Sequence, residues 1–169
     1  MCGTILVAIF VSGCGQHKDS LITRWETANQ TFRIRVSEYA ERGPMPTPSG
    51  AYYVFESAPL HSGDWNHITT FRHDDQIGIP RDQVRFVNDN IGYVFMGWMY
   101  AVTMDGGATW HVWNAEADLP NWQCCNHGLI KDVLLNSDGN GTMELKPIER
   151  RRGEVPGLRT SDYGRNWRQ

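Results

Sequence analysis

VRFVNDNIGYVFMGWMYAVTMDGGATWHVW, at residues 84–113, carries the clearest structural pattern in this chain. It reads as two apolar strands, a glycine break and a further strand, followed by a polar loop, TMDGGATW, at residues 103–110. The short side chain of Asp105 can accept hydrogen bonds from backbone N–H groups of its own loop. Glycines supply the positive φ angles of a tight reversal, and Trp110 can bury its large ring under the sheet. The pattern therefore predicts antiparallel strands joined by a structural hairpin loop.

The chain repeats this arrangement. Residues 160–167, TSDYGRNW, copy the loop at an offset of 57, with Asn in place of the second Thr. The segment at 133–143 aligns with 84–94 at an offset of 49, so the second unit carries an insertion, most simply at 148–157. A weaker third copy at 52–65 has the same order of strand, loop and tryptophan without the Asp. We therefore expect Trp65, Trp110 and Trp167 to occupy equivalent positions in three successive units.

The two loops fit the pattern Ser/Thr-x-Asp-x-Gly-x-Thr-Trp, which resembles the Asp-box of the bacterial neuraminidase repeat, a hairpin loop on propeller blades. Phe86, Gly92 and Tyr93 ahead of the first loop make the photosystem-assembly-factor-like and sortilin-like groups the nearest resemblance. That resemblance implies a non-enzymatic assembly or binding module. It gives a structural role to Thr103, Asp105, Gly107, Thr109, Trp110, Thr160, Asp162, Gly164 and Trp167.

Sialidases also carry Asp-boxes, but this chain departs from their pattern. Their Arg-Ile-Pro motif is missing, because Gly78 precedes Ile79 and Pro80. At 169 residues the chain is also too short for a six-bladed catalytic ring.

Length and composition predict one all-β domain at residues 21–169. Seven Trp, six Tyr and six Phe favour sheet, and Phe32, Ile34 and Val36 alternate with polar residues as in a half-buried strand. Closed propellers use about 4–8 blades, so three units predict an open or compacted structure whose sheet edges could pair with a second copy as a homodimer. Further strands are expected at 21–27, 31–39, 51–57, 65–71, 129–135 and 142–148, with an irregular segment at 115–128.

The N-terminus predicts export. An apolar run at 5–11 ends in Ser12-Gly13-Cys14, is too short to span a bilayer, and reads as a signal peptide at 1–13 followed by a tether at 14–20. The sequence around Cys14 resembles a bacterial lipobox, which implies lipidation of Cys14. Gly15 after this cysteine implies an outer-membrane lipoprotein facing the periplasm if the cell is Gram-negative. The first four residues contain no Lys or Arg, which leaves a buried strand or a start further upstream as alternatives.

The formal net charge of −3 argues against a general nucleic-acid binder. The charge is uneven, since residues 146–168 hold seven Lys/Arg against three Asp/Glu, a balance of +4. The rest of the chain therefore carries −7. The run Arg150-Arg151-Arg152 is typical of a solvated turn.

Few residue clusters suggest chemistry. Cys124 and Cys125 could form a disulfide or stay as a thiol pair near His127. His61, His67 and His73, with Asp64, Asp74 and Asp75, could gather as a hydrolytic site, although their spacing favours a surface location. The oxygens of Asn136, Asp138, Asn140, Thr142 and Glu144 alternate as in a calcium loop, but a hairpin turn explains them equally. We expect no catalytic residue, no metal and no cofactor.

Three functions remain from the sequence. The first is a lipid-anchored, non-enzymatic binding or assembly module with a protein partner in the cell envelope. The second is a small glycosidase-like hydrolase that uses the histidines and aspartates. The third is a purely structural envelope protein.

Overall fold

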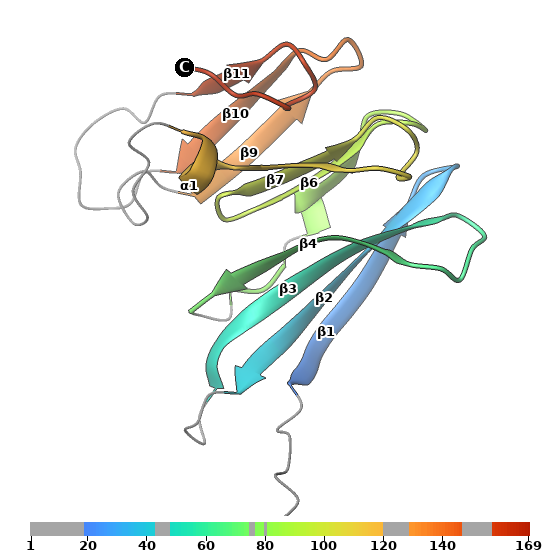
Figure 1. The fold of residues 1–169 in the computed structure, drawn as a ribbon, viewed down its shortest axis with the longest axis vertical. Coiled ribbons are helices and arrows are strands. Elements are labelled where there is room, and N and C mark those ends of the chain that lie inside the picture. Colours follow the sequence, from blue (N-terminus) through green and yellow to red (C-terminus); the bar gives the residue numbers. More distant parts are fainter. Residues whose placement is uncertain (1–18, 43–47, 75–76, 80, 120–128, 147–156) are drawn as a thin grey trace, which may run out of the picture.

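The structure is a computed structural model that describes residues 19–42, 48–74, 77–79, 81–119, 129–146 and 157–169. In this part of the chain the regular structure is nearly all strand, arranged in three antiparallel sheets of four, four and three strands (Figure 1). None of these sheets closes into a barrel. The predicted all-β, open and propeller-like fold is therefore confirmed.

Sheet A contains β1 (Ser20–Ala28), β2 (Phe32–Arg42), β3 (Pro48–Pro59) and β4 (Asn66–His73), in that spatial order. Its strands form where apolar and polar residues alternate. Phe32, Ile34 and Val36 are fully buried on one face of β2, while the intervening arginines lie on the other face. Asn29 closes the β1–β2 turn, because its side-chain oxygen accepts hydrogen bonds from two backbone N–H groups of that turn.

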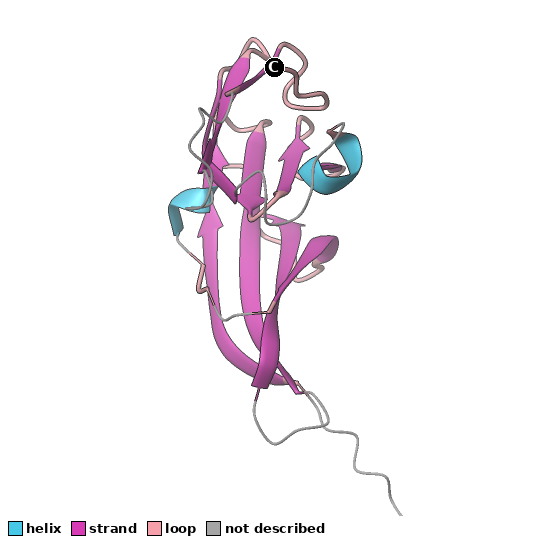
Figure 2. Cartoon of the chain, turned by 90° about the vertical axis from the view of Figure 1, so that its left-hand side faces the viewer, coloured by secondary structure: helices cyan, strands magenta, loops and turns pink. Residues whose placement is uncertain are grey.

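Sheet B contains β5 (Val84–Phe86), β6 (Gly92–Met96), β7 (Met99–Thr103) and β8 (His111–Asn114). Every residue of β6 and β7 is buried, which matches their continuous apolar sequence. A strand that is apolar on both faces needs a partner layer on each side. Two short helices flank this sheet, η1 (Arg81–Gln83) before β5 and α1 (Ala115–Asp118) after β8, and they lie on opposite sides in Figure 2.

Sheet C contains β9 (Leu129–Leu135), β10 (Gly141–Lys146) and β11 (Leu158–Thr160), in the spatial order β11-β10-β9. One further residue pair, Arg159 with Arg168, extends it at the place where sheets A and B have a fourth strand. All three sheets therefore follow the same up-and-down order, and the last strand of sheet C is reduced to a single bridge.

Sheet B lies between sheets A and C, with one apolar cluster on each side (Figure 1). The A–B cluster consists of Phe32, Ile34, Val36, Ala51, Tyr53, Phe55, Ile68, Phe71, Val84, Val94, Met96, Met99 and Ala101. The B–C cluster consists of Ile91, Tyr93, Phe95, Tyr100, Val102, Trp113, Ala115, Ile130, Val133, Leu135, Met143, Leu145, Leu158 and Trp167. The sheets thus stack face to face in chain order, and burial of these apolar faces is the main force that holds them together.

The strands predicted from the sequence all occur, with ends shifted by up to three residues. The segment at 115–128 was expected to be irregular, but its first four residues form α1. The Asn114 side chain caps this helix by accepting a hydrogen bond from the Glu116 N–H at 2.9 Å. Residues 120–128 and the insertion expected at 148–157, apart from its last residue, lie outside the described part of the chain.

Candidate functional site

The loop at 103–110 is organised around the carboxylate of Asp105. Oδ1 accepts hydrogen bonds from the Thr103 hydroxyl at 2.8 Å and from the Thr109 N–H at 2.9 Å. Oδ2 accepts the Thr109 hydroxyl at 2.5 Å. The Thr103 hydroxyl oxygen in turn accepts the Gly107 N–H at 2.9 Å. Both oxygens of Asp105 are therefore used inside its own loop.

The loop at 160–167 repeats these hydrogen bonds one by one. Asp162 accepts the Thr160 hydroxyl at 2.7 Å and the Asn166 N–H at 3.0 Å, both at Oδ1. The Asn166 side-chain amide donates to Oδ2 at 2.7 Å, in place of the Thr109 hydroxyl. The Gly164 N–H donates to the Thr160 hydroxyl at 2.9 Å. The exchange of Thr for Asn thus replaces a hydroxyl donor with an amide donor at the same position.

The two carboxylates share an electrostatic state as well. Desolvation raises the pKa of Asp105, but the hydrogen bonds from Thr109 and Thr103 outweigh it and leave this pKa below the ordinary value of 3.8. The pKa of Asp162 is lowered in the same way, with desolvation opposing hydrogen bonds from Asn166 and Thr160. Each donor binds the charged form better than the protonated form, so both groups are ionised at neutral pH.

The backbone of both loops passes through the left-handed region. Gly106 and Gly107 have φ of 69° and 84°, and Tyr163 and Gly164 have 64° and 79°. The second residue of each pair, Gly107 or Gly164, also meets an aromatic ring of the preceding sheet. A Cβ on Gly107 would lie 2.7 Å from the Phe32 ring, and one on Gly164 would lie 2.6 Å from the Tyr100 ring. Glycine at these two positions is therefore required both by the turn and by the close approach.

Each loop is fastened to the sheet before it. The Ser57 hydroxyl on β3 donates to the Gly107 carbonyl at 3.0 Å and accepts from the Trp110 indole N–H at 2.9 Å. On sheet B, the Tyr100 hydroxyl donates to the Tyr163 carbonyl at 3.0 Å. The loops therefore act as clamps between neighbouring sheets. Ser57 and Tyr100 could not be predicted as partners of these loops, because they lie in strands of other units.

The three tryptophans share a place in the chain but not an environment. Each immediately precedes the fourth strand of its sheet, or the single bridge of sheet C, as expected. Trp167 is only 4% exposed and packs edge-on against Tyr100, while Trp110 is half-buried. Trp65 instead lies over the guanidinium groups of Arg33 and Arg35 on the outer face of sheet A. Among the described residues no sheet precedes sheet A for the Trp65 loop to clamp, so the equivalence of Trp65 is one of order only.

The histidines proposed for a hydrolytic site do not gather. His67 and His73 lie near opposite ends of β4, about 20 Å apart at the rise of about 3.3 Å per residue of a strand. His61 lies in the turn after β3, and Asp75 is outside the described residues. Among the residues that are described, no three His, Cys, Asp or Glu side chains are grouped closely enough to hold a metal ion.

The alternating oxygens at 136–144 form a hairpin. The Asn136 N–H donates to the Asn140 carbonyl at 2.8 Å, and Asp138 accepts both the N–H and the side-chain amide of Asn140 at 2.9 and 2.8 Å. Thr142 and Glu144 continue along β10. The turn itself thus accounts for the spacing that resembles a calcium loop.

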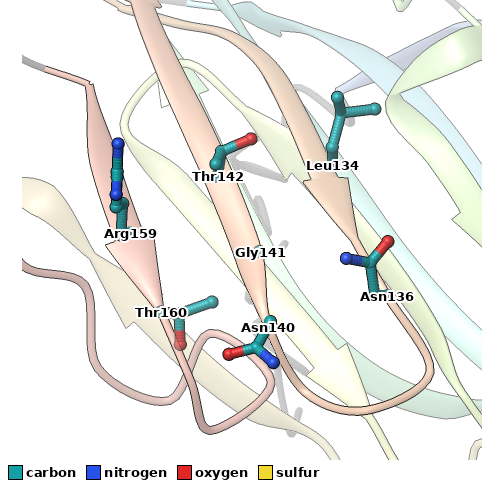
Figure 3. A pocket seen from close by; sticks show the side chains of 7 residues that line it. All are labelled: Leu134, Asn136, Asn140, Gly141, Thr142, Arg159 and Thr160. Carbon is teal, nitrogen blue, oxygen red and sulfur yellow. The ribbon is translucent and has the colours of Figure 1, made fainter.

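Two surface hollows lie beside sheet C. The first hollow, of about 380 Å³, lies on the outer face of sheet C. It is lined by Leu134, Asn136, Asn140, Gly141, Thr142, Arg159 and Thr160 (Figure 3). The other, of about 440 Å³, lies between β8 and the C-terminal segment, and its lining includes His111, Asp118, Arg165 and Arg168. The lining of each hollow includes at least one arginine. The sequence predicts a positive balance for this region, and the alternation Leu158-Arg159-Thr160 indicates that Arg159 points outward.

Several predicted features lie in residues that the structure does not describe. Cys14, Cys124, Cys125, the signal peptide at 1–13 and most of the tether at 14–20 are not among the described residues. Neither of the two described helices is long or apolar enough to cross a membrane.

Comparison of the chain with protein-family models, with curated proteins and with solved structures finds no match. The geometry of this chain is therefore the only basis for its proposed function.

Proposed function

We propose that this chain is a lipid-anchored, non-enzymatic binding or assembly module of a bacterial envelope, built from propeller-like blades with Asp-box loops. In this proposal Cys14 carries the lipid and the β domain extends into the periplasm from the outer membrane. The domain holds a protein partner there.

The observation that carries the proposal is the use of Asp105 and Asp162. These are the repeated carboxylates of the chain, and each directs both oxygens to donors of its own loop. A general base or nucleophile needs an oxygen within reach of a substrate. Carboxylates that are committed to loop donors instead support a scaffold, whose function lies in the surface that it presents.

The hydrolase hypothesis lacks a specific observation in its favour. It requires His61, His67 and an aspartate such as Asp74 to converge, but His61 lies in the turn after β3, and His67 and His73 lie near opposite ends of β4. The third hypothesis, a purely structural envelope protein, differs from the first only in having no partner. A partner assay therefore separates these two.

Membrane attachment is tested with labelled palmitate in bacteria that express the full chain. We expect the wild type to incorporate the label and to sediment with outer membranes. Cys14→Ser should abolish labelling and release the protein without unfolding it, since residue 14 precedes the first strand. Cys2→Ser is the matched control and should keep the label. A wild type that never incorporates palmitate would remove the anchor from the proposal.

Partner binding is tested by affinity purification of the wild-type chain from envelopes solubilised in a neutral detergent. We expect a defined protein to co-purify in a fixed ratio. If no protein co-purifies although the chain is labelled and folded, the structural role replaces the binding role.

A further inference from the structure

The outer face of sheet C carries a continuous cross-strand row. Thr142 on β10 is opposite Leu134 on β9 and opposite Arg159 on β11, and Arg159 is opposite Arg168. Residues that are directly opposite in an antiparallel sheet point to the same face. Figure 3 shows Leu134, Thr142 and Arg159 side by side on their three strands. All four side chains are exposed, and Leu134 is 59% exposed.

The arginine pair at the end of this row is held together by the backbone. Arg159 and Arg168 exchange both backbone hydrogen bonds, at 2.7 and 2.9 Å, so their side chains leave the sheet as immediate neighbours. Like charges directly opposite each other destabilise a sheet. In the described part of the chain neither guanidinium group has an ion pair or a side-chain hydrogen bond.

Five other basic side chains in the described part of the chain have a carboxylate partner. Arg33, Arg35 and Arg72 on sheet A pair with glutamates, and Arg85 pairs with Asp132 at 2.7 Å. Glu144, the acidic neighbour of the row on β10, is already paired with Lys131 at 2.6 Å. Among the described residues, the Arg159–Arg168 pair is a site where two positive charges lie together without an ion pair, and Asp118 is a carboxylate in the lining of the hollow beside Arg168.

The surroundings of the pair fit a ligand with acidic groups. Arg159 lines the hollow of about 380 Å³ on the outer face, and Arg168 lines the neighbouring one together with Arg165. Guanidinium groups bind carboxylates through two parallel hydrogen bonds. The exposed Leu134 at the other end of the row can contact an apolar side chain.

We propose that this row binds the carboxylates of an acidic segment in a partner protein. The inference rests on the proposed binding function and names the chemistry of its partner. Its place in the fold favours a protein over the anchoring membrane. Sheet C lies at the opposite end of the long axis from Ser20, where β1 begins, and the proposed lipid lies on the N-terminal side of Ser20 (Figure 1).

The test uses the full chain in neutral detergent and a fluorescein-labelled hexaglutamate peptide, followed by fluorescence anisotropy. We expect the peptide to bind and a hexaglutamine peptide not to bind. The double variant Arg159→Gln/Arg168→Gln should weaken the binding by about tenfold or more, because it removes both charged donors. Hexaglutamate should also raise the melting temperature of the wild type, and the double variant should lose this shift.

Arg72→Gln is the matched control, since Arg72 is exposed and lies on sheet A. It should leave hexaglutamate affinity within about twofold, because a charge on the distant sheet is screened by salt. Equal weakening by Arg72→Gln and by each single variant at the pair would show a general charge effect and overturn the proposal. Absence of hexaglutamate binding would overturn it as well. So would tighter binding to vesicles of anionic phospholipid than to the peptide, which would identify a membrane surface instead.

The outcome is separable from that of the proposed function. If a partner co-purifies equally well with the wild type and with Arg159→Gln/Arg168→Gln, the binding module stands and the acidic site is wrong. If the wild type binds hexaglutamate but no protein co-purifies, the site stands and the assembly role is lost.

Discussion

A carboxylate that bonds only to its own loop works as a brace, and this chain has the same brace twice. Asp105 and Asp162 each accept a hydrogen bond from the threonine hydroxyl two residues earlier and another from a side-chain donor four residues later. The bonds are alike although the fourth residue is Thr in one loop and Asn in the other. The chemistry of the position is therefore that of a short donor, and side chains without a short donor should fail there.

Removal of the first brace should lower stability without a change in the surface. Asp105→Ala leaves the Thr109 N–H and the Thr103 hydroxyl without their acceptor, and we expect the free energy of unfolding to fall by roughly 1–3 kcal/mol. Urea unfolding measures this. Asp89→Ala, in an exposed turn nearby, is the control and should change stability by less than about 0.5 kcal/mol. Unchanged melting with lost binding would show that Asp105 is a functional carboxylate.

The depressed pKa values of the two braces predict a pH dependence. The unfolded chain takes up a proton at each aspartate at a higher pH than the folded chain does, so acid favours unfolding. The contribution of both groups should be complete above about pH 4 and should be lost as the pH falls through their lower folded pKa values. Urea midpoints at about pH 6 and about pH 3 should differ less in Asp105→Asn/Asp162→Asn than in the wild type. An equal difference between the two urea midpoints in both proteins would contradict a lowered pKa for Asp105 and Asp162.

At the scale of the element, the tryptophans that precede the fourth strands and the bridge of sheet C should contribute unequally to stability. Trp167→Ala empties a buried site and should cost about 3–5 kcal/mol. Trp110→Ala should cost less, because Trp110 is half-buried, and Trp65→Ala should cost about 0.5–1 kcal/mol through its cation–π contacts. Thermal unfolding of the three variants should give this order. A Trp65 variant as unstable as the Trp167 variant would mean that the first unit is clamped like the others.

Local signals determined how much of these elements the sequence could predict. Alternation at Phe32, Ile34 and Val36 and the turn at 136–141 specify strands and reversals within a few neighbours, so their positions were predictable. The helix α1 was missed because its four residues depend on one cap, Asn114, which looks like any loop residue in the sequence.

For each clamp, the sequence predicts the loop residues but not the residues of the preceding sheet that the loop contacts. Asp105 and its donors lie within one loop and follow from its pattern, whereas the receiving groups Ser57 and Tyr100 are distant in the chain. The Arg159–Arg168 pair was missed for the same reason. Its register is set by a bridge at the end of sheet C and not by any local pattern.

For the molecule as a whole, the central position of sheet B predicts an order of local stability. Its strands β6 and β7 are buried on both faces, whereas β1 is the outer strand of sheet A and most of its residues are exposed. Hydrogen exchange followed by mass spectrometry should show slow exchange in β6 and β7, limited by global unfolding. β1 should exchange by local opening and respond little to urea. Equal protection of β1 and β7 would contradict this picture.

The positions of the clamps in the sequence also set the order in which the sheets and their clamp loops are synthesised. Each clamp reaches back to the sheet before it and is encoded near the end of its own unit, after the first three strands. The N-terminal part of a chain is synthesised first. A growing chain therefore exposes a finished sheet first and receives the part that locks the next sheet onto it last. A chain interrupted before residue 160 would therefore contain the clamp loop at 103–110 and lack the clamp loop at 160–167.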